Sequence, residues 1–197
     1  MNNLNLFIMT KKEFTPEQQL KRIEEMVFEA RIRFEDNGFA YILWGAVIAV
    51  ASFSQAYLIH LEKYTISWYP YLLMPLVGLF TFVYYAKKER KKKNPINTIY
   101  SRVWIFTSVN VMLLAFAFNG YLQENLVAII LILLGMATLI SGSIIRSNVV
   151  LASGLLLELS GFGAFFLSWE QQPLLMGVLG LVAVLLPGIV LAQKRSK

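Results

Sequence analysis

The sequence contains no cysteine and only one histidine, His60. Disulfides, thiolate nucleophiles and sulfur-ligated metals are therefore excluded. A metal site needs several ligands and a catalytic base needs a partner, but only Glu62 lies close to His60 in the sequence. The sequence also lacks paired acids and a nucleophile–base set. We therefore expect no catalytic residue, no metal and no cofactor, and we do not expect an enzyme.

Charged residues are also scarce. They make up 15% of the 197 residues, whereas a soluble domain carries about 25%. Hydrophobic residues make up 57%, and the mean hydropathy is +0.58. Because a soluble domain of about 150 residues buries only about 70% of its unfolded surface, this apolar excess requires lipid. The net charge of +6 comes from basic residues at the ends of apolar runs, so nucleic acid is not an expected partner.

Six apolar stretches are long enough to cross a bilayer, which takes about 20 helical residues. They cover about 39–60, 67–86, 99–119, 125–145, 148–168 and 173–192, and no Lys or Arg lies in the middle of any of them. The predicted fold class is therefore all-α, a polytopic membrane protein with a six-transmembrane-helix bundle. Residues 1–38 form a cytoplasmic N-terminal segment, 39–192 the membrane domain and 193–197 a basic cytoplasmic tail.

The basic residues predict the orientation. Of the 18 Lys and Arg, all but Lys63 fall on one side of these six spans, which places both termini in the cytoplasm. The basic loop Lys87–Lys93 suits anionic headgroups, although a simple stop-transfer anchor is the favoured interpretation of it. Aromatic residues near the inner ends of the spans, among them Tyr41, Tyr100 and Trp104, are interpreted as interfacial anchors.

An amphipathic helix is predicted over 16–36. Thr15, Pro16 and Gln18 form a helix start in which Thr15 and Gln18 complete a capping box. One face of this helix carries apolar residues at alternating spacings of three and four, namely Leu20, Ile23, Val27, Ala30 and Phe34. Three covers are possible for this face: the inner membrane surface, the protein's own bundle or another protein. The segment from Glu17 to Asp36 has six acids and four bases, whereas lipid-surface helices are usually basic. Contact with protein is therefore favoured over lipid, either with the protein's own bundle or with a partner, which would be a second copy in a homodimer or a cytoplasmic protein.

Glu158 lies halfway along the fifth predicted span. An acid at that depth costs roughly 2.5–3.5 kcal/mol to insert. Gly154 and Gly161 share its helical face, so a neighbouring helix is expected to approach closely and Glu158 to point into the bundle. Arg146 is too far away to pair with it, and Asn110 is the best hydrogen-bond partner at matching depth, with Ser52, Ser54 and Thr138 as lesser candidates. Glu158 and Asn110 are thus the candidate intramembrane polar site, either structural or coupled to protons or cations.

The order of short motifs resembles a known family. A charged amphipathic helix leads into Trp44-Gly45, a basic loop follows the second span, Ser141-Gly142-Ser143-Ile144-Ile145-Arg146 closes the fourth, and Pro187-Gly188 interrupts the last. This pattern resembles an uncharacterised family of six-helix inner-membrane proteins from Gram-negative bacteria, often encoded beside a small winged-helix regulator. The resemblance implies a multi-pass protein of the bacterial inner membrane and carries no assigned activity or functional residue.

Two classes of function remain open. The first is a non-enzymatic sensing, regulatory or partner-docking membrane component that acts through helix 16–36, and it is the favoured interpretation. The alternative is a small proton- or cation-coupled transporter or channel that uses Glu158.

Overall fold

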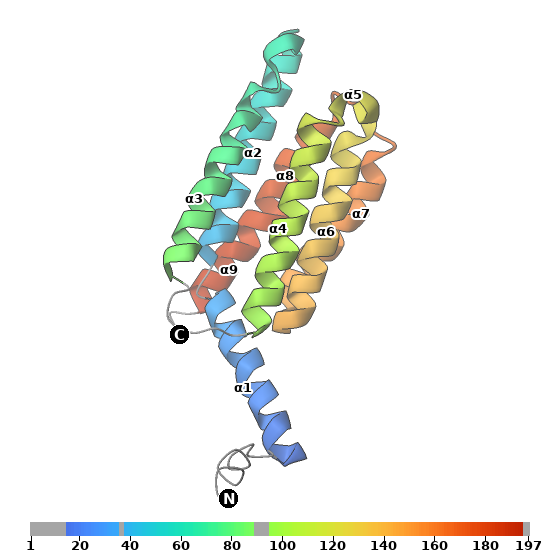
Figure 1. The fold of residues 1–197 in the computed structure, drawn as a ribbon. Coiled ribbons are helices and arrows are strands. Elements are labelled where there is room, and N and C mark those ends of the chain that lie inside the picture. Colours follow the sequence, from blue (N-terminus) through green and yellow to red (C-terminus); the bar gives the residue numbers. More distant parts are fainter. Residues whose placement is uncertain (1–14, 36–37, 89–94, 195–197) are drawn as a thin grey trace, which may run out of the picture.

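The computed structural model describes residues 15–35, 38–88 and 95–194, and within these ranges every regular element is a helix (Figure 1). The longer helices are α1 (Pro16–Glu35), α2 (Gly38–His60), α3 (Leu73–Lys88), α4 (Pro95–Phe116), α6 (Leu126–Ile145), α7 (Asn148–Ala164), α8 (Gln172–Leu179) and α9 (Leu186–Lys194). The short elements are η1 (Tyr64–Ile66), η2 (Tyr69–Leu72), α5 (Asn119–Leu122), η4 (Gln123–Asn125) and the π-helix η5 (Gly180–Leu185). The predicted all-α class is confirmed.

Five helical segments are long and apolar enough to cross a membrane: Gly38–His60, Tyr64–Tyr85, Thr98–Phe116, Leu126–Ile145 and Gln172–Gln193. They fit a multi-pass membrane protein. The predicted span 148–168 is shorter in the structure, because α7 has only 17 residues and ends at Ala164. It rises about 26 Å, slightly less than the roughly 30 Å of hydrocarbon. The side-chain amide of Gln172 donates to the carbonyl oxygens of Ala164 and Leu167, which stabilises this early helix end.

Helices α6 and α7 form a tight antiparallel hairpin along a seam of glycines. Gly135 and Gly142 on α6, and Gly154 and Gly161 on α7, are each seven residues apart. A Cβ atom added at Gly135 would lie 2.6 Å from the backbone nitrogen of Glu158, and one added at Gly154 would lie 2.7 Å from that of Leu139. Backbones can approach this closely only because these positions carry no side chain. The predicted close approach at Gly154 and Gly161 is confirmed.

The hairpin turns at Arg146 and Ser147. Arg146 adopts the left-handed conformation, with φ of 52°, at a position that glycine usually occupies. The amide of Ser147 donates to the carbonyl of Gly142, and that of Arg146 to the carbonyl of Ser143. These two bonds form a Schellman motif, which explains how two residues suffice to reverse the chain.

A second seam joins α2 to the last span. Gly45 packs against Leu185, and a Cβ atom added at Gly188 would lie 2.7 Å from the backbone nitrogen of Ile42. The last span also packs on the hairpin, because Leu179 and Ala183 belong to one buried cluster with residues of α6 and α7. The last span therefore lies between α2 and the α6–α7 hairpin (Figure 1).

The last span is interrupted, as predicted from Pro187-Gly188. Proline has no amide hydrogen, and its ring conflicts with the carbonyl of the residue four positions earlier. The turn before Pro187 accordingly widens into the π-helix η5, and α9 begins at Leu186. Gly188 itself serves close packing against α2.

Helices α3 and α4 lie at the periphery. Half of the most apolar window of α6 is buried inside the bundle, compared with 6% of the window in Tyr64–Tyr85 and none of that in Thr98–Phe116. Figure 1 shows α3 beside α2, and α4 beside α6 on the other side of the molecule. The first and last described helices, α1 and α9, meet at the same end of the bundle.

Candidate functional site

Helix α1 begins as the sequence predicts. The amide of Gln18 donates to the Thr15 hydroxyl at 3.3 Å, and the amide of Thr15 donates to the Gln18 side-chain oxygen at 3.2 Å. This reciprocal capping box satisfies two backbone donors at the helix start, so the chain leaves its N-terminal segment as a regular helix.

The exposed side of α1 includes part of the predicted partner-docking face. Leu20 is 59% exposed and Ile23 is 51% exposed, and Phe28, which the sequence analysis did not include, is exposed as well. The side chains of Val27, Ala30 and Phe34 lie outside the described residues. Helix α1 contacts α4, α6 and α9 at the lower end of the bundle, and its N-terminal part extends away from them (Figure 1).

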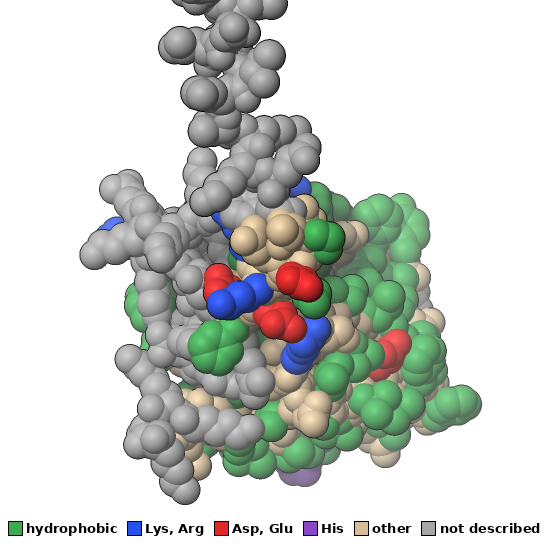
Figure 2. Space-filling model, turned by 90° about the horizontal axis from the view of Figure 1, so that it is seen from below, with side chains coloured by type: hydrophobic (Ala, Val, Ile, Leu, Met, Phe, Trp, Pro, Cys, Tyr) green, Lys and Arg blue, Asp and Glu red, His purple; other side chains and the backbone are tan. Residues whose placement is uncertain are grey.

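Charged side chains of both signs surround these apolar residues. Figure 2, which views the molecule from below, shows acidic and basic side chains intermixed at this end and hydrophobic side chains on the flanks. On the described part of α1, the exposed charged residues are Glu17, Lys21, Arg22, Glu24 and Glu25. Of the predicted headgroup-binding loop, Lys87 is exposed on α3, while residues 89–93 lie outside the described ranges.

Glu158 is half-buried on α7. Its backbone and Cβ atom lie against Gly135 of α6, so the stem of the side chain is held at the edge of the glycine seam. The expectation that it points fully into the bundle is therefore only partly met. Within the described ranges, no set of three His, Asp or Glu residues lies close enough to hold a metal ion.

The predicted hydrogen bond between Glu158 and Asn110 is absent among the described residues. Asn110 is exposed on α4, and its side-chain amide donates to the carbonyl of Phe106 at 2.8 Å. Helix α6 lies between α4 and α7, which keeps the two candidate residues apart (Figure 1). The position of each residue along its helix could be predicted from the sequence, but the neighbouring helix could not.

The other candidate partners of Glu158 also bond elsewhere. The Ser52 hydroxyl lies 3.0 Å from that of Tyr71, and this contact joins α2 to η2. The Thr138 hydroxyl donates to the carbonyl of Leu134 in its own helix at 2.7 Å. No described hydrogen bond links Ser54 to Glu158.

A polar and aromatic cluster inside the bundle was missed by the sequence analysis. Tyr41 is buried with Ile145 and Leu191, and Tyr100 packs against the same group. Tyr41 is therefore a core residue, and its interpretation as an interfacial anchor is wrong. The indole nitrogen of Trp104 donates to the Ser141 hydroxyl at 3.1 Å, which joins α4 to α6. Aromatic residues at span ends predict an interface, and only the packing distinguishes a core residue from an anchor.

Gln172 is a second missed residue. The sequence places it in a polar break, but it is buried, and its side-chain amide also donates to the carbonyl of Glu124 at 2.7 Å. Together with its bonds to the end of α7, this one side chain joins three segments at the end of the bundle opposite α1 (Figure 1). Its role is structural.

Comparison of the chain with family models, with curated proteins and with solved structures finds no significant match. The resemblance to the six-helix inner-membrane family therefore stays a prediction.

Proposed function

We propose that this chain is a non-enzymatic docking component of the bacterial inner membrane, which recruits a cytoplasmic protein through the exposed apolar face of α1. It crosses the membrane six times and keeps both termini in the cytoplasm. Its role is sensing or regulatory, since a docked cytoplasmic protein would be held at the membrane through α1.

The six-span topology is supported by the direction of the helices. Helices α6 and α8–α9 run the same way through the bundle, so α7 has to return across the membrane between them (Figure 1). Its 17 residues are at the lower limit for a crossing, which a locally thinned bilayer accommodates at small cost. An even number of crossings agrees with α1 and α9 lying at one end. The basic residues, all but Lys63 on that side, support a cytoplasmic location for it.

The observation that carries the docking proposal is the exposure of Leu20 and Ile23 on a helix outside the bundle. Burying a leucine or isoleucine side chain stabilises a complex by about 1.5–3 kcal/mol. These two residues lie one turn apart and form an apolar face that water does not favour.

A protein partner explains this face better than the membrane surface does. A helix that binds lipid lies in the plane of the interface, whereas α1 extends away from the end of the bundle (Figure 1). The segment from Glu17 to Asp36 also carries six acids and four bases, so anionic headgroups would repel it. A groove on a protein partner can bind a helix that extends away from the membrane, and it need not be negatively charged.

Photo-crosslinking in cells tests this proposal. A benzophenone amino acid is placed at Ile23 of the full chain and, as a matched control, at Lys21, which faces away from the apolar stripe. We expect Ile23 to crosslink to protein and Lys21 to crosslink far less. Leu20→Glu should abolish the Ile23 product at an unchanged membrane level of the chain. Crosslinks to lipid alone, or equal products at both positions, would refute protein docking through this face.

Proton- or cation-coupled transport is a second candidate, favoured by the half-buried carboxyl of Glu158 midway along α7. It requires a group that changes its charge, and the Glu158→Gln variant described below separates it from the docking function.

A further inference from the structure

Helix α4 is the least buried of the candidate spans, yet it carries an amide deep in the membrane. Asn110 lies eight residues after Arg102 and six before Phe116, where α4 ends. At 1.5 Å per residue, this places Asn110 about 12 Å from Arg102 and about 9 Å from the end of the helix. Its side chain is exposed on the surface of the bundle, where lipid would surround it.

The internal contacts of Asn110 satisfy only part of its side chain. An amide has two N–H donors and a carbonyl acceptor. One donor is used in the bond to the carbonyl of Phe106. The second donor and the acceptor have no partner among the described residues. Lipid supplies neither, so these two groups are unsatisfied in hydrocarbon, which is unfavourable.

The residues around Asn110 form a face suited to another helix. Ile99, Phe106 and Leu113 follow one another at seven-residue spacing, and so do Asn110 and Ala117. All five are exposed, Phe106 at 65% and Leu113 at 50%. A repeat of seven residues keeps two helices in contact when they cross at about 20°. Apolar exposure alone is normal toward lipid, so the amide within this face is the informative feature.

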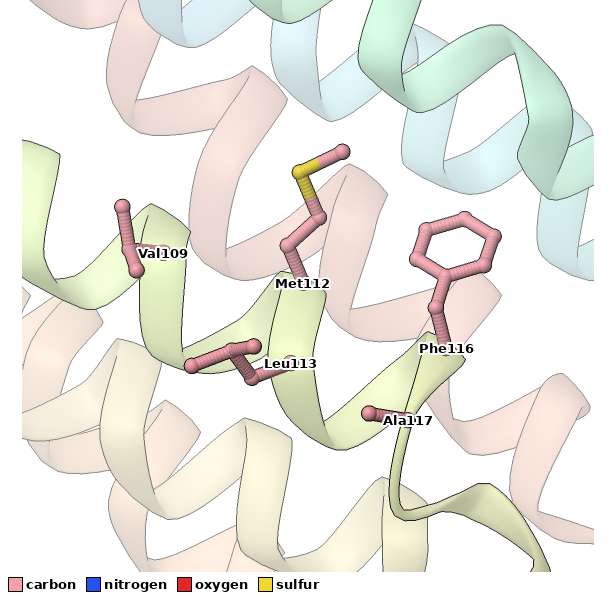
Figure 3. Close-up of a pocket in the computed structure, with 5 residues that line it drawn as sticks. All are labelled: Val109, Met112, Leu113, Phe116 and Ala117. Atoms are coloured by element: carbon pink, nitrogen blue, oxygen red, sulfur yellow. The ribbon is translucent and has the colours of Figure 1, made fainter.

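A shallow hollow lies beside this face. It has a volume of about 310 Å³ and is lined only by apolar side chains of one stretch of the chain, namely Val109, Met112, Leu113, Phe116 and Ala117. Figure 3 shows these side chains spreading from α4, with Met112 and Phe116 pointing to the same side. A bulky apolar side chain of a facing helix fits such a hollow as a knob fits a hole.

We propose that α4 is the contact between two copies of this chain, with the Asn110 amides of the two copies hydrogen-bonded to each other. All copies insert in the same direction, so a twofold axis along the membrane normal places every residue opposite its counterpart at equal depth. Asn110 then meets Asn110. An amide is both donor and acceptor, so two identical side chains satisfy each other, whereas a different partner would need its own polar group at this depth. The proposal does not depend on docking through α1.

Disulfide crosslinking in native membranes tests the contact, because the chain has no cysteine of its own. We expect Leu113→Cys to form dimers under mild oxidation. Leu159→Cys, on the lipid-facing side of α7, is the matched control because it is similarly exposed, at 60%, and should remain monomeric. Equal crosslinking at the two positions, or none at Leu113, overturns the proposal. Photo-crosslinking of Leu113 to lipid alone, or to a different protein, does so as well.

The role of the amide is tested by the dimer affinity of the purified full chain, measured in detergent by fluorescence transfer. Asn110→Leu should weaken dimerisation about 3- to 20-fold, the range expected for interhelical hydrogen bonds in membranes. Asn110→Gln keeps the amide and should retain most of the affinity. Leucine is more apolar than asparagine and eases membrane insertion. The total amount of the Asn110→Leu chain in the membrane should therefore equal that of the wild type, and this control separates a loss of dimer from misfolding. An Asn110→Leu dimer as tight as the wild type overturns the proposal.

Discussion

The α6–α7 hairpin and helix α4 differ far more in packing than in their suitability for lipid. Helices α4, α6 and α7 are all apolar. In the hairpin, four glycines at the seam allow the backbones of α6 and α7 to come into contact. Helix α4 contains no glycine, and none of its apolar window is buried. Lipid tails are as apolar as leucine, so hydrophobicity does not hold helices together inside a bilayer. Small residues and polar groups do, and their distribution separates the core of this protein from its periphery.

A polar contact joins α4 to the hairpin. The indole of Trp104 donates to the Ser141 hydroxyl, which in turn donates to the carbonyl of Ala137 in its own helix. None of the apolar window of α4 is buried within one copy. Its exposed face is therefore available for the proposed contact between two copies.

The largest effect is expected at the glycine seam. Gly161→Leu adds a side chain whose Cβ atom alone would lie 2.8 Å from the backbone nitrogen of Ile132. The two helices have to separate, so we expect the free energy of unfolding to fall by about 3 kcal/mol. Reversible unfolding in mixed detergent micelles measures this change.

Gly163→Leu provides the control on the same helix. A Cβ atom at Gly163 meets nothing within 4 Å, so we expect no loss of stability and, from helix propensity, a small gain. Equal destabilisation at Gly161 and Gly163 would show that the seam is not what holds the hairpin.

A smaller effect is expected for the tie between α4 and α6. Trp104→Phe keeps an aromatic ring and removes the indole donor, while Ser141 keeps its own acceptor in Ala137. Interhelical hydrogen bonds in membranes average about 0.6 kcal/mol, and we expect a loss of that order in unfolding free energy. In a double-mutant cycle with Ser141→Ala, the two changes should be less than additive. Full additivity would contradict the contact.

The smallest effect is expected at Glu158. Glu158→Gln keeps the shape of the side chain at the edge of the seam, so the free energy of unfolding should change by less than about 0.5 kcal/mol. In proteoliposomes, a docking component gives no proton or cation flux with either side chain. Glu170→Gln, exposed in the loop before α8, is the matched control. A wild-type flux that Glu158→Gln alone abolishes would establish transport and contradict the favoured function.

Local properties of the sequence were sufficient for much of the fold. The positions of the spans follow from hydropathy, which is summed along the chain, and from the fixed thickness of a bilayer, which sets the length of each span. The capping box at Thr15 and Gln18 depends on residues close in sequence and was predicted. The length of α7 was not, because Gln172, distant from the helix start, stabilises its early end.

The candidate site shows what only the tertiary structure decided. The positions of Glu158 and Asn110 along their helices could be read from the sequence, but their pairing depended on which helices are neighbours, and α6 separates them. Tyr41 likewise has the residue type and the position near a span end that are typical of an interfacial anchor, but it packs as a core residue. Position along a helix depends on distance along one chain, whereas contact depends on the rotation and order of several helices. In lipid these are set by glycine seams and a few hydrogen bonds between distant segments.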